Sequence, residues 1–225
     1  MNEMNSNNAW YFIKPNDYDT HMSHPNVAQT QMLNKIIKEQ FELLPQDQRS
    51  ASCVAILGIT NGNGLEHVIP CGIDRIVGID INKEFLDECR VRFPALEPKL
   101  SLYELDLMTE ITEAVEILSE CDLIIANLLI EHIHLENFSK IVSALPKHGQ
   151  TISSVIQVNP DGVIASASGV EHVFDAVVKQ VEEENENDLI YSMKKCGMFL
   201  RSRTMYNLPN GKQFIRLDFT TTAEN

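Results

Sequence analysis

The stretch of residues 54–80 constrains the fold of this chain more than any other part of the sequence. It begins in an apolar run, passes through a segment with three glycines, and reaches a second apolar run that ends at Asp80. The pattern predicts a strand, a turn, a short helix and a second strand, at residues 53–57, 58–64, 65–70 and 75–79. Such a unit is typical of an α/β domain with a parallel sheet.

The glycine-containing turn is the predicted ligand site. A turn that follows a strand and opens a helix lets a ligand come close to the backbone, and its free N–H groups face that ligand. Asp80 lies at the tip of the second strand, where a carboxylate can accept two hydrogen bonds from a ribose diol. The sequence therefore predicts a nucleoside-containing cofactor.

The dinucleotide fingerprint G-x-G-x-x-G is incomplete, because His67 stands where its third glycine is needed. The turn instead resembles the first motif of the class I S-adenosylmethionine-dependent methyltransferases, an acid followed by G-x-G-x-G. Gly62 and Gly64 match its last two glycines, whereas Gly58 occupies the place of the acid and Thr60 that of the first glycine. Asp80 falls where the family holds the ribose.

This resemblance implies a fold, a cofactor and a set of contacts. The implied fold is a Rossmann-like sheet of seven mostly parallel strands, with helices on both faces and a C-terminal antiparallel hairpin. The implied donor is S-adenosylmethionine, with S-adenosylhomocysteine as the product. Expected cofactor contacts are Tyr18, Met22, Gly58, Thr60, Gly62, Gly64, Asp80, Ile81, Asp106, Leu107, Asn127 and Leu128. Asp106 would reach the adenine amino group, and Asn127 and Leu128 would lie where cofactor and acceptor meet.

The first 45 residues are expected to form a helical lid over a compact domain of residues 46–225. Apolar spacing predicts a helix over residues 26–44, preceded by a loop that holds Tyr18, His21 and Met22. Their spacing resembles a Y-x-x-H-M run found in a subgroup of these methyltransferases. Aromatic and thioether side chains suit a cap over a sulfonium cation, although they equally suit a simple anchor for the helix.

The remaining chain alternates between predicted helices and strands. Helices are expected at residues 82–93, 109 onward, 128–145 and 170–184, and strands at 100–105, 121–127 and 148–158. Residues 159–169 form a polar loop that could gate the acceptor pocket. The segments around Asn210-Gly211 alternate as a β-hairpin does. Asp106 remains open to a second interpretation, as a cap of the helix that follows it.

Two histidines are candidates for a general base. Methyl transfer is an in-line displacement, and a hydroxyl or protonated amine acceptor must also lose a proton. His132 follows the fourth predicted strand and His21 lies in the lid, although a single histidine is more often structural. A metal site is not expected, because His132 and His134 would point about 200° apart on a helix.

Composition favours a small-molecule partner. The net charge of -14 repels nucleic acid, and the segment of about 18 apolar residues that a membrane span needs does not occur. The N-terminal residues are polar and lack a secretory signal pattern, so a cytoplasmic location with five reduced cysteines is expected. Two other functions stay open: a non-catalytic binding protein with the methyltransferase fold, and a nicotinamide-dependent oxidoreductase.

Overall fold

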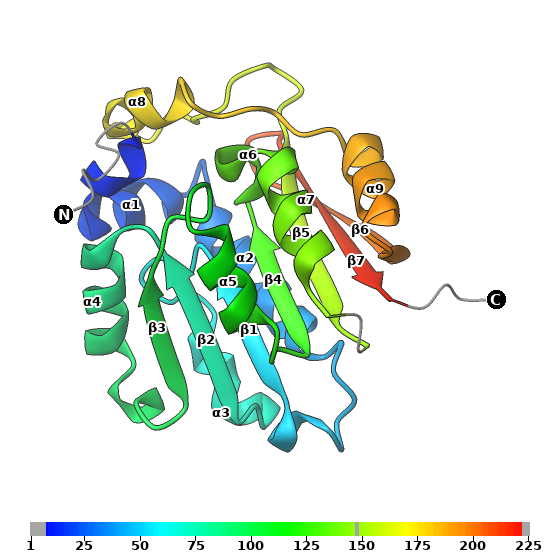
Figure 1. Cartoon of the computed structure of the whole chain (residues 1–225). Coiled ribbons are helices and arrows are strands. Elements are labelled where there is room, and N and C mark those ends of the chain that lie inside the picture. Colours follow the sequence, from blue (N-terminus) through cyan, green and yellow to red (C-terminus); the bar gives the residue numbers. More distant parts are fainter. Residues whose placement is uncertain (1–7, 147–148, 222–225) are drawn as a thin grey trace.

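The computed structural model describes residues 8–146 and 149–221, and these form a three-layer α/β/α domain around one sheet (Figure 1). The sheet has seven strands in the order β3-β2-β1-β4-β5-β7-β6. Their bounds are β1 Cys53–Leu57, β2 Arg75–Asp80, β3 Leu100–Glu104, β4 Leu123–Asn127, β5 Thr151–Val158, β6 Phe199–Asn207 and β7 Gln213–Thr220.

The first five strands of the sheet are parallel, and the last two form an antiparallel hairpin. β7 pairs antiparallel with both β5 and β6, so it lies between them. The predicted hairpin around Asn210-Gly211 is therefore confirmed, and so is the predicted fold class. The chain builds the sheet from β1 outward in one direction to β3 and then in the other direction from β4, so the order reverses between β1 and β4. A crevice forms at the carboxyl ends of these two strands, and open α/β sheets bind their ligands in such a crevice.

Helices cover both faces of the sheet because the strands at its centre are apolar on both sides (Figure 1). All five residues of β1 are buried. Val54 and Ile56 belong to the core cluster beneath α2 (Gln29–Phe41), α3 (Val68–Cys71) and α4 (Lys83–Arg92). Ala55 and Leu57 belong to the cluster on the other face, beneath α5 (Ile111–Leu118), α7 (Leu135–Ala144) and α9 (Glu186–Lys195). This two-sided burial is expected of a central parallel strand.

Helices connect the strands along the described part of the chain. The α-helices are α1 Pro15–Met22, α2 Gln29–Phe41, α3 Val68–Cys71, α4 Lys83–Arg92, α5 Ile111–Leu118, α6 Ile130–Ile133, α7 Leu135–Ala144, α8 Asp175–Val178 and α9 Glu186–Lys195. Short 3-10 helices are η1 Ala9–Phe12, η2 Arg49–Ala51, η3 Leu65–His67, η4 Pro94–Leu96 and η5 Glu171–Phe174.

Three expectations about helices are corrected. The segment with Tyr18, His21 and Met22 is helix α1 rather than a loop, and it begins with a proline in its first turn, where the missing N–H has no cost. The helix expected over residues 128–145 is split at His134, whose φ of 66° breaks it into α6 and α7. The helix expected over 170–184 is reduced to η5 and α8, since the residues that follow α8 are irregular up to Asn185.

Other boundaries differ only at their ends. α2 is shorter than the predicted 26–44, and β5 begins at Thr151 rather than 148, which lies outside the described residues. α5 begins at Ile111 rather than near 109. α2 packs Ile37 and Phe41 into the core beside β1 and β4. The division into a lid of 1–45 and a domain of 46–225 stays a prediction.

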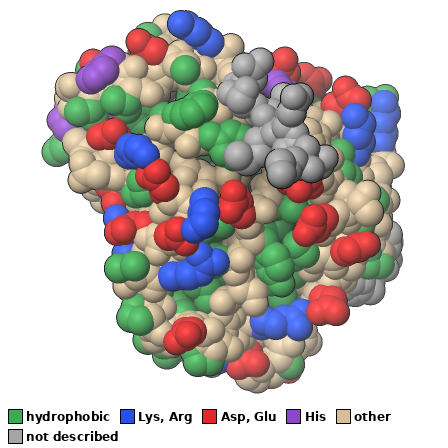
Figure 2. Space-filling view, turned by 60° about the vertical axis from the view of Figure 1, so that its left-hand side comes forward, with side chains coloured by type: hydrophobic (Ala, Val, Ile, Leu, Met, Phe, Trp, Pro, Cys, Tyr) green, Lys and Arg blue, Asp and Glu red, His purple; other side chains and the backbone are tan. Residues whose placement is uncertain are grey.

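Charges on the face around α4 are mixed (Figure 2). Basic side chains of α4 pair with acids one turn away, as in Lys83 with Asp87 and Arg92 with Glu88. This interspersed pattern differs from the continuous basic surface that a nucleic-acid backbone needs. None of the helices in the described part of the chain combines the length and apolar character required to cross a bilayer.

Candidate functional site

A cavity opens at the carboxyl ends of β1, β2 and β4, where the glycine-containing turn that follows β1 lies near α1 and α6. Most of the sequence-predicted site residues line it, although they come from five separate segments. The predicted residues in its wall are Tyr18, His21, Met22, Gly58, Thr60, Asp80, Ile81, Asp106, Leu107, Asn127, Leu128 and His132. The fold thus brings together side chains more than 110 residues apart in the sequence.

Asp80 is held by backbone amides on both of its carboxylate oxygens. Oδ2 accepts from the N–H of Thr60 at 2.8 Å, and Oδ1 accepts from the N–H of Asn82 at 2.9 Å. The side chain is buried, and burial raises its pKa to about 6 despite these hydrogen bonds. Each carboxylate oxygen keeps a second lone pair, so the group can still accept hydrogen bonds from a ligand.

Thr60 adopts a left-handed backbone conformation with a φ of 49°. This conformation is uncommon for a β-branched residue and is the one that glycine favours. Thr60 stands where the motif has its first glycine, and it adopts a backbone conformation that glycine favours. Leu128, at the end of β4, has a φ of 52° and lines the same cavity. Two left-handed residues other than glycine in the wall of one cavity are typical of a ligand site that the surrounding fold holds in place.

Gly62 and Gly64 do not line the cavity, and the structure gives both a packing reason. A Cβ on Gly64 would approach Cγ2 of Ile37 at 2.7 Å, so this glycine lets α2 lie against the turn. A Cβ on Gly62 would approach the Sγ of Cys89 on α4 at 2.8 Å. Their predicted contact with a cofactor stays a prediction.

Asp106 lies at the end of β3, is buried and faces the cavity. Its Oδ1 accepts from the N–H of Met108 at 2.9 Å, which closes a local turn before α5. The N-cap residue of α5 is Glu110, so Asp106 does not cap that helix as the second interpretation expected. Its other carboxylate oxygen makes no protein hydrogen bond among the described contacts and is available to a ligand.

An aromatic cluster forms one side of the cavity, and sequence reasoning missed its central member, Trp10. The Trp10 ring lies 4.9 Å from that of His132, edge to face, and 6.3 Å from that of Tyr18. Asn82 ties this segment to β2, because its Nδ2 donates to the carbonyl of Trp10 at 2.8 Å. Burial raises the pKa of the Tyr18 phenol to about 12, so this side chain is neutral. Trp10 is the only tryptophan of the sequence, and a single large aromatic residue close to Tyr18 was the signal that could have indicated it as a site residue.

Both predicted histidines lie in the cavity wall. Nδ1 of His21 lies 2.7 Å from Oγ of Ser168, which links α1 to the loop of residues 159–169. Burial lowers the pKa of His21, and it lowers that of His132 to about 4. Both imidazoles are therefore neutral at pH 7.

Glu131 is a second residue that sequence reasoning missed. It lies on α6, directly after β4, is 6% exposed and lines the cavity. Its Oε1 accepts from the N–H of Gln157 at 2.9 Å, but its buried Oε2 has no partner within the described part of the chain. The signal in the sequence that could have pointed to it is a single acid among the mostly apolar residues 128–133.

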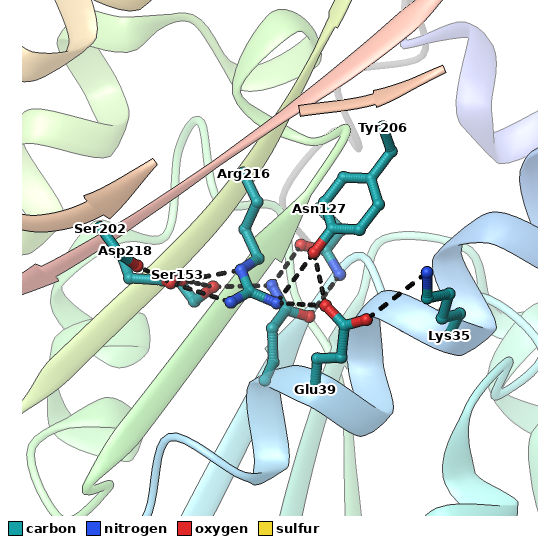
Figure 3. Close-up of polar contacts among 9 residues, drawn as sticks. Lys35, Glu39, Asn127, Ser153, Ser202, Tyr206, Arg216 and Asp218 are labelled. Carbon is teal, nitrogen blue, oxygen red and sulfur yellow. Dashed lines mark hydrogen bonds and ion pairs between the residues drawn. The ribbon is translucent and has the colours of Figure 1, made fainter. Parts of the chain in front are cut away.

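Asn127 belongs to a polar network that joins α2 to the far half of the sheet (Figure 3). Its amide pairs reciprocally with that of Gln40, at 2.8 and 2.9 Å, and Gln40 also donates to Oγ of Ser153. Ser153 donates to Asp218 on β7, whose carboxylate pairs with Arg216. The orientation of Asn127 is thus set by α2 and β5, and the oxygen and one N–H of its amide are already paired with Gln40.

The cysteines and acids offer no metal site within residues 8–146 and 149–221. No group of three His, Cys, Asp or Glu side chains there is arranged to hold a metal ion. The five cysteines are free thiols. The sulfur atoms of Cys53 and Cys121 lie 3.2 Å apart, and Cys53 begins β1, at the opposite end of that strand from the cavity.

Comparison with solved structures identifies proteins with this fold. The structure of magnesium protoporphyrin IX methyltransferase from Synechocystis PCC 6803, with bound S-adenosylhomocysteine, has a TM-score of 0.61, 13% identity, and coverage of 84% of this chain and 83% of that one. Geranyl diphosphate C-methyltransferase from Streptomyces coelicolor A3(2) has a TM-score of 0.60 at 10% identity, with 85% and 79% coverage. An S-adenosylmethionine-dependent methyltransferase from Mesorhizobium loti has a TM-score of 0.58 at 12% identity, with 81% and 95% coverage. No family model and no curated protein sequence matches the chain.

Proposed function

Because this chain has the fold of the class I S-adenosylmethionine-dependent methyltransferases, we propose that it transfers a methyl group from S-adenosylmethionine to a small-molecule acceptor. The observation that carries the proposal is Asp80. Its buried carboxylate lies at the end of β2, fixed by two backbone amides, and faces a cavity with free lone pairs. This is the arrangement that a ribose diol requires.

The other walls suit the remaining parts of that ligand. Asp106 offers a carboxylate oxygen to an adenine amino group, and Ile81 and Leu107 provide apolar surface beside it. The left-handed turn at Thr60 and the end of β4 at Leu128 flank the space that remains for the amino-acid end and the acceptor. When bound, S-adenosylmethionine supplies an electrophilic methyl group on a sulfonium.

The protein's own contribution is positioning and proton transfer. Tyr18 and Met22 on α1 lie in the wall of the same cavity and present an aromatic ring and a soft sulfur, which stabilise a nearby cation. The imidazoles of His21 and His132 are neutral and can accept a proton, although the pKa of about 4 makes His132 a weak base. Both assignments stay predictions, since the acceptor decides which proton must leave.

Isothermal titration with S-adenosylmethionine and S-adenosylhomocysteine tests the proposal. We expect both to bind, and Asp80→Ala to weaken binding by about 10-fold or more, because hydrogen bonds to a charged group are lost. Asp87→Ala is the matched control, since Asp87 is an exposed aspartate of α4. Failure of the folded protein to bind either compound would refute the proposed function. Tight binding without methyl transfer to any acceptor would instead indicate a non-catalytic protein.

A further inference from the structure

The unpartnered oxygen of Glu131 requires a hydrogen-bond donor from outside the described chain. Leaving a carboxylate oxygen buried without a donor is costly, and folded proteins rarely do so. Oε1 is satisfied by Gln157, so the side chain is held in place while Oε2 stays without a partner in the cavity wall. A bound ligand with an N–H or O–H group would remove that cost.

A second buried polar atom supports a ligand in this part of the cavity. Nε1 of Trp10 is also buried and has no hydrogen-bond acceptor among the described residues. Trp10 contacts His132, the neighbour of Glu131, and all three residues line the cavity. The wall of this cavity therefore holds two buried polar atoms, one donor and one acceptor, that lack partners among the described residues.

The charge of the cavity wall limits what that molecule can be. Four carboxylates line the cavity, from Asp80, Asp106, Glu131 and Glu183, whereas the described residues place no Lys or Arg in its wall. The nearby ammonium of Lys212 is buried and donates to the carbonyl of Ile164 at 2.5 Å. An anionic acceptor, such as a carboxylate or phosphate, would meet repulsion from these carboxylates without a Lys or Arg in the described wall to pair with.

Much of the rest of the wall is apolar, although the amide side chains of Gln29, Gln157 and Asn159 also line it. Side chains of Leu33, Ile164, Phe174, Val177, Val178 and Val181 line the cavity. Phe174 and Val177 lie in η5 and α8, whose apolar residues form one cluster with Ala9, Ile13 and Phe85. The molecule that fits such a wall has an apolar body and a cationic or neutral hydrogen-bond donor that can reach Glu131.

We infer that the methyl acceptor is an apolar amine, and that Oε2 of Glu131 binds its N–H group. This inference rests on the proposed function. In the reaction, the bound ammonium first passes one proton to the Glu131 carboxylate, which frees the nitrogen lone pair. That lone pair forms the new N–CH₃ bond, and the S–CH₃ bond breaks with its electron pair kept by sulfur. Burial raises the pKa of Glu131 to about 7, which suits a group that accepts a proton near neutral pH.

Binding of simple probes to the protein saturated with S-adenosylhomocysteine tests the inference. The probes are benzylamine, tryptamine and octylamine, compared with phenylacetate, indole-3-propionate, octanoate and benzyl alcohol. We expect at least one amine to bind and to be methylated by labelled S-adenosylmethionine, and the acids not to bind. Absence of binding by all three amines, or stronger binding by an acid or the alcohol, would overturn the inference.

The variant Glu131→Gln gives the residue-level test. Glutamine retains an oxygen for the N–H of Gln157 but loses the charge, so we expect amine binding to weaken about 10- to 100-fold with S-adenosylhomocysteine binding unchanged. Glu136→Gln makes the same chemical change at an exposed position of α7 and should change neither. Unchanged amine binding in Glu131→Gln would exclude the role of Glu131. If S-adenosylhomocysteine itself does not bind the wild-type protein, the proposed function fails instead.

Discussion

Removing Asp218 should destabilise the protein by about 3 kcal/mol, because it leaves buried donors and a buried cation behind. Asp218 is fully buried and accepts from Ser153 at 2.6 Å, Ser202 at 2.5 Å and Arg216 at 3.2 Å (Figure 3). Breaking a buried ion pair by removing one partner costs about 3–5 kcal/mol. We expect the lower end for Asp218→Ala, since Glu39 still neutralises Arg216 at 3.0 Å.

Thermal and urea unfolding followed by circular dichroism measure this cost. In a chain of this length, about 3 kcal/mol corresponds to a fall of roughly 6–12 °C in Tm. Asp87→Ala removes an exposed aspartate that pairs with Lys83 and Arg90, and its Tm should hardly change. A loss below about 1 kcal/mol in Asp218→Ala would refute the argument, because it would mean that Arg216 does not depend on its buried partner.

Two further predictions concern the turn and its acid. Gly64→Ala should destabilise the protein by about 1–3 kcal/mol more than Gly72→Ala in urea unfolding. Both positions have a positive φ, so both variants carry the same backbone strain, but only at Gly64 does the new Cβ meet Ile37. Equal losses in the two variants would contradict the packing argument. Affinity for S-adenosylhomocysteine, measured by isothermal titration, should rise about tenfold from pH 5 to pH 7. The reason is that Asp80, with a pKa of about 6, loses its proton over this range and becomes a carboxylate. The variant Asp80→Asn should abolish this pH dependence. Because the folded pKa lies above the unfolded value, Asp80 favours folding below about pH 4, and this contribution is lost as the pH rises through 6.

The parts of the site that lie at strand ends could be predicted from the sequence. Asp80, Asp106 and Asn127 each follow an apolar run, and the carboxyl ends of parallel strands meet at one edge of a sheet. The hairpin was predictable for a similar reason, since alternation and an Asn-Gly turn are local signals. These features depend on a few neighbouring residues, and they survive in any structure that contains the strands.

Helix α1 was missed because its sequence carries little of the apolar periodicity on which helix prediction depends. His21 is its only fully buried residue. Its helical form depends on the proline in its first turn and on contacts such as Tyr18 against Phe85 of α4, at 5.3 Å between ring centres. Contacts of that kind depend on the packing of distant segments, and periodicity within one segment does not contain them.

By itself, the sequence determined the strands, the glycine turn between them and the acids at their tips, because each follows from local hydrophobic pattern and backbone conformation. Only the tertiary structure decided which side chains share the cavity. It brought Trp10 against His132, left Oε2 of Glu131 without a partner among the described residues, and fixed the orientation of Asn127 through Gln40. Whether a buried polar atom is satisfied depends on neighbours far away in the chain, so the chemistry of this site became visible only when the segments were packed together.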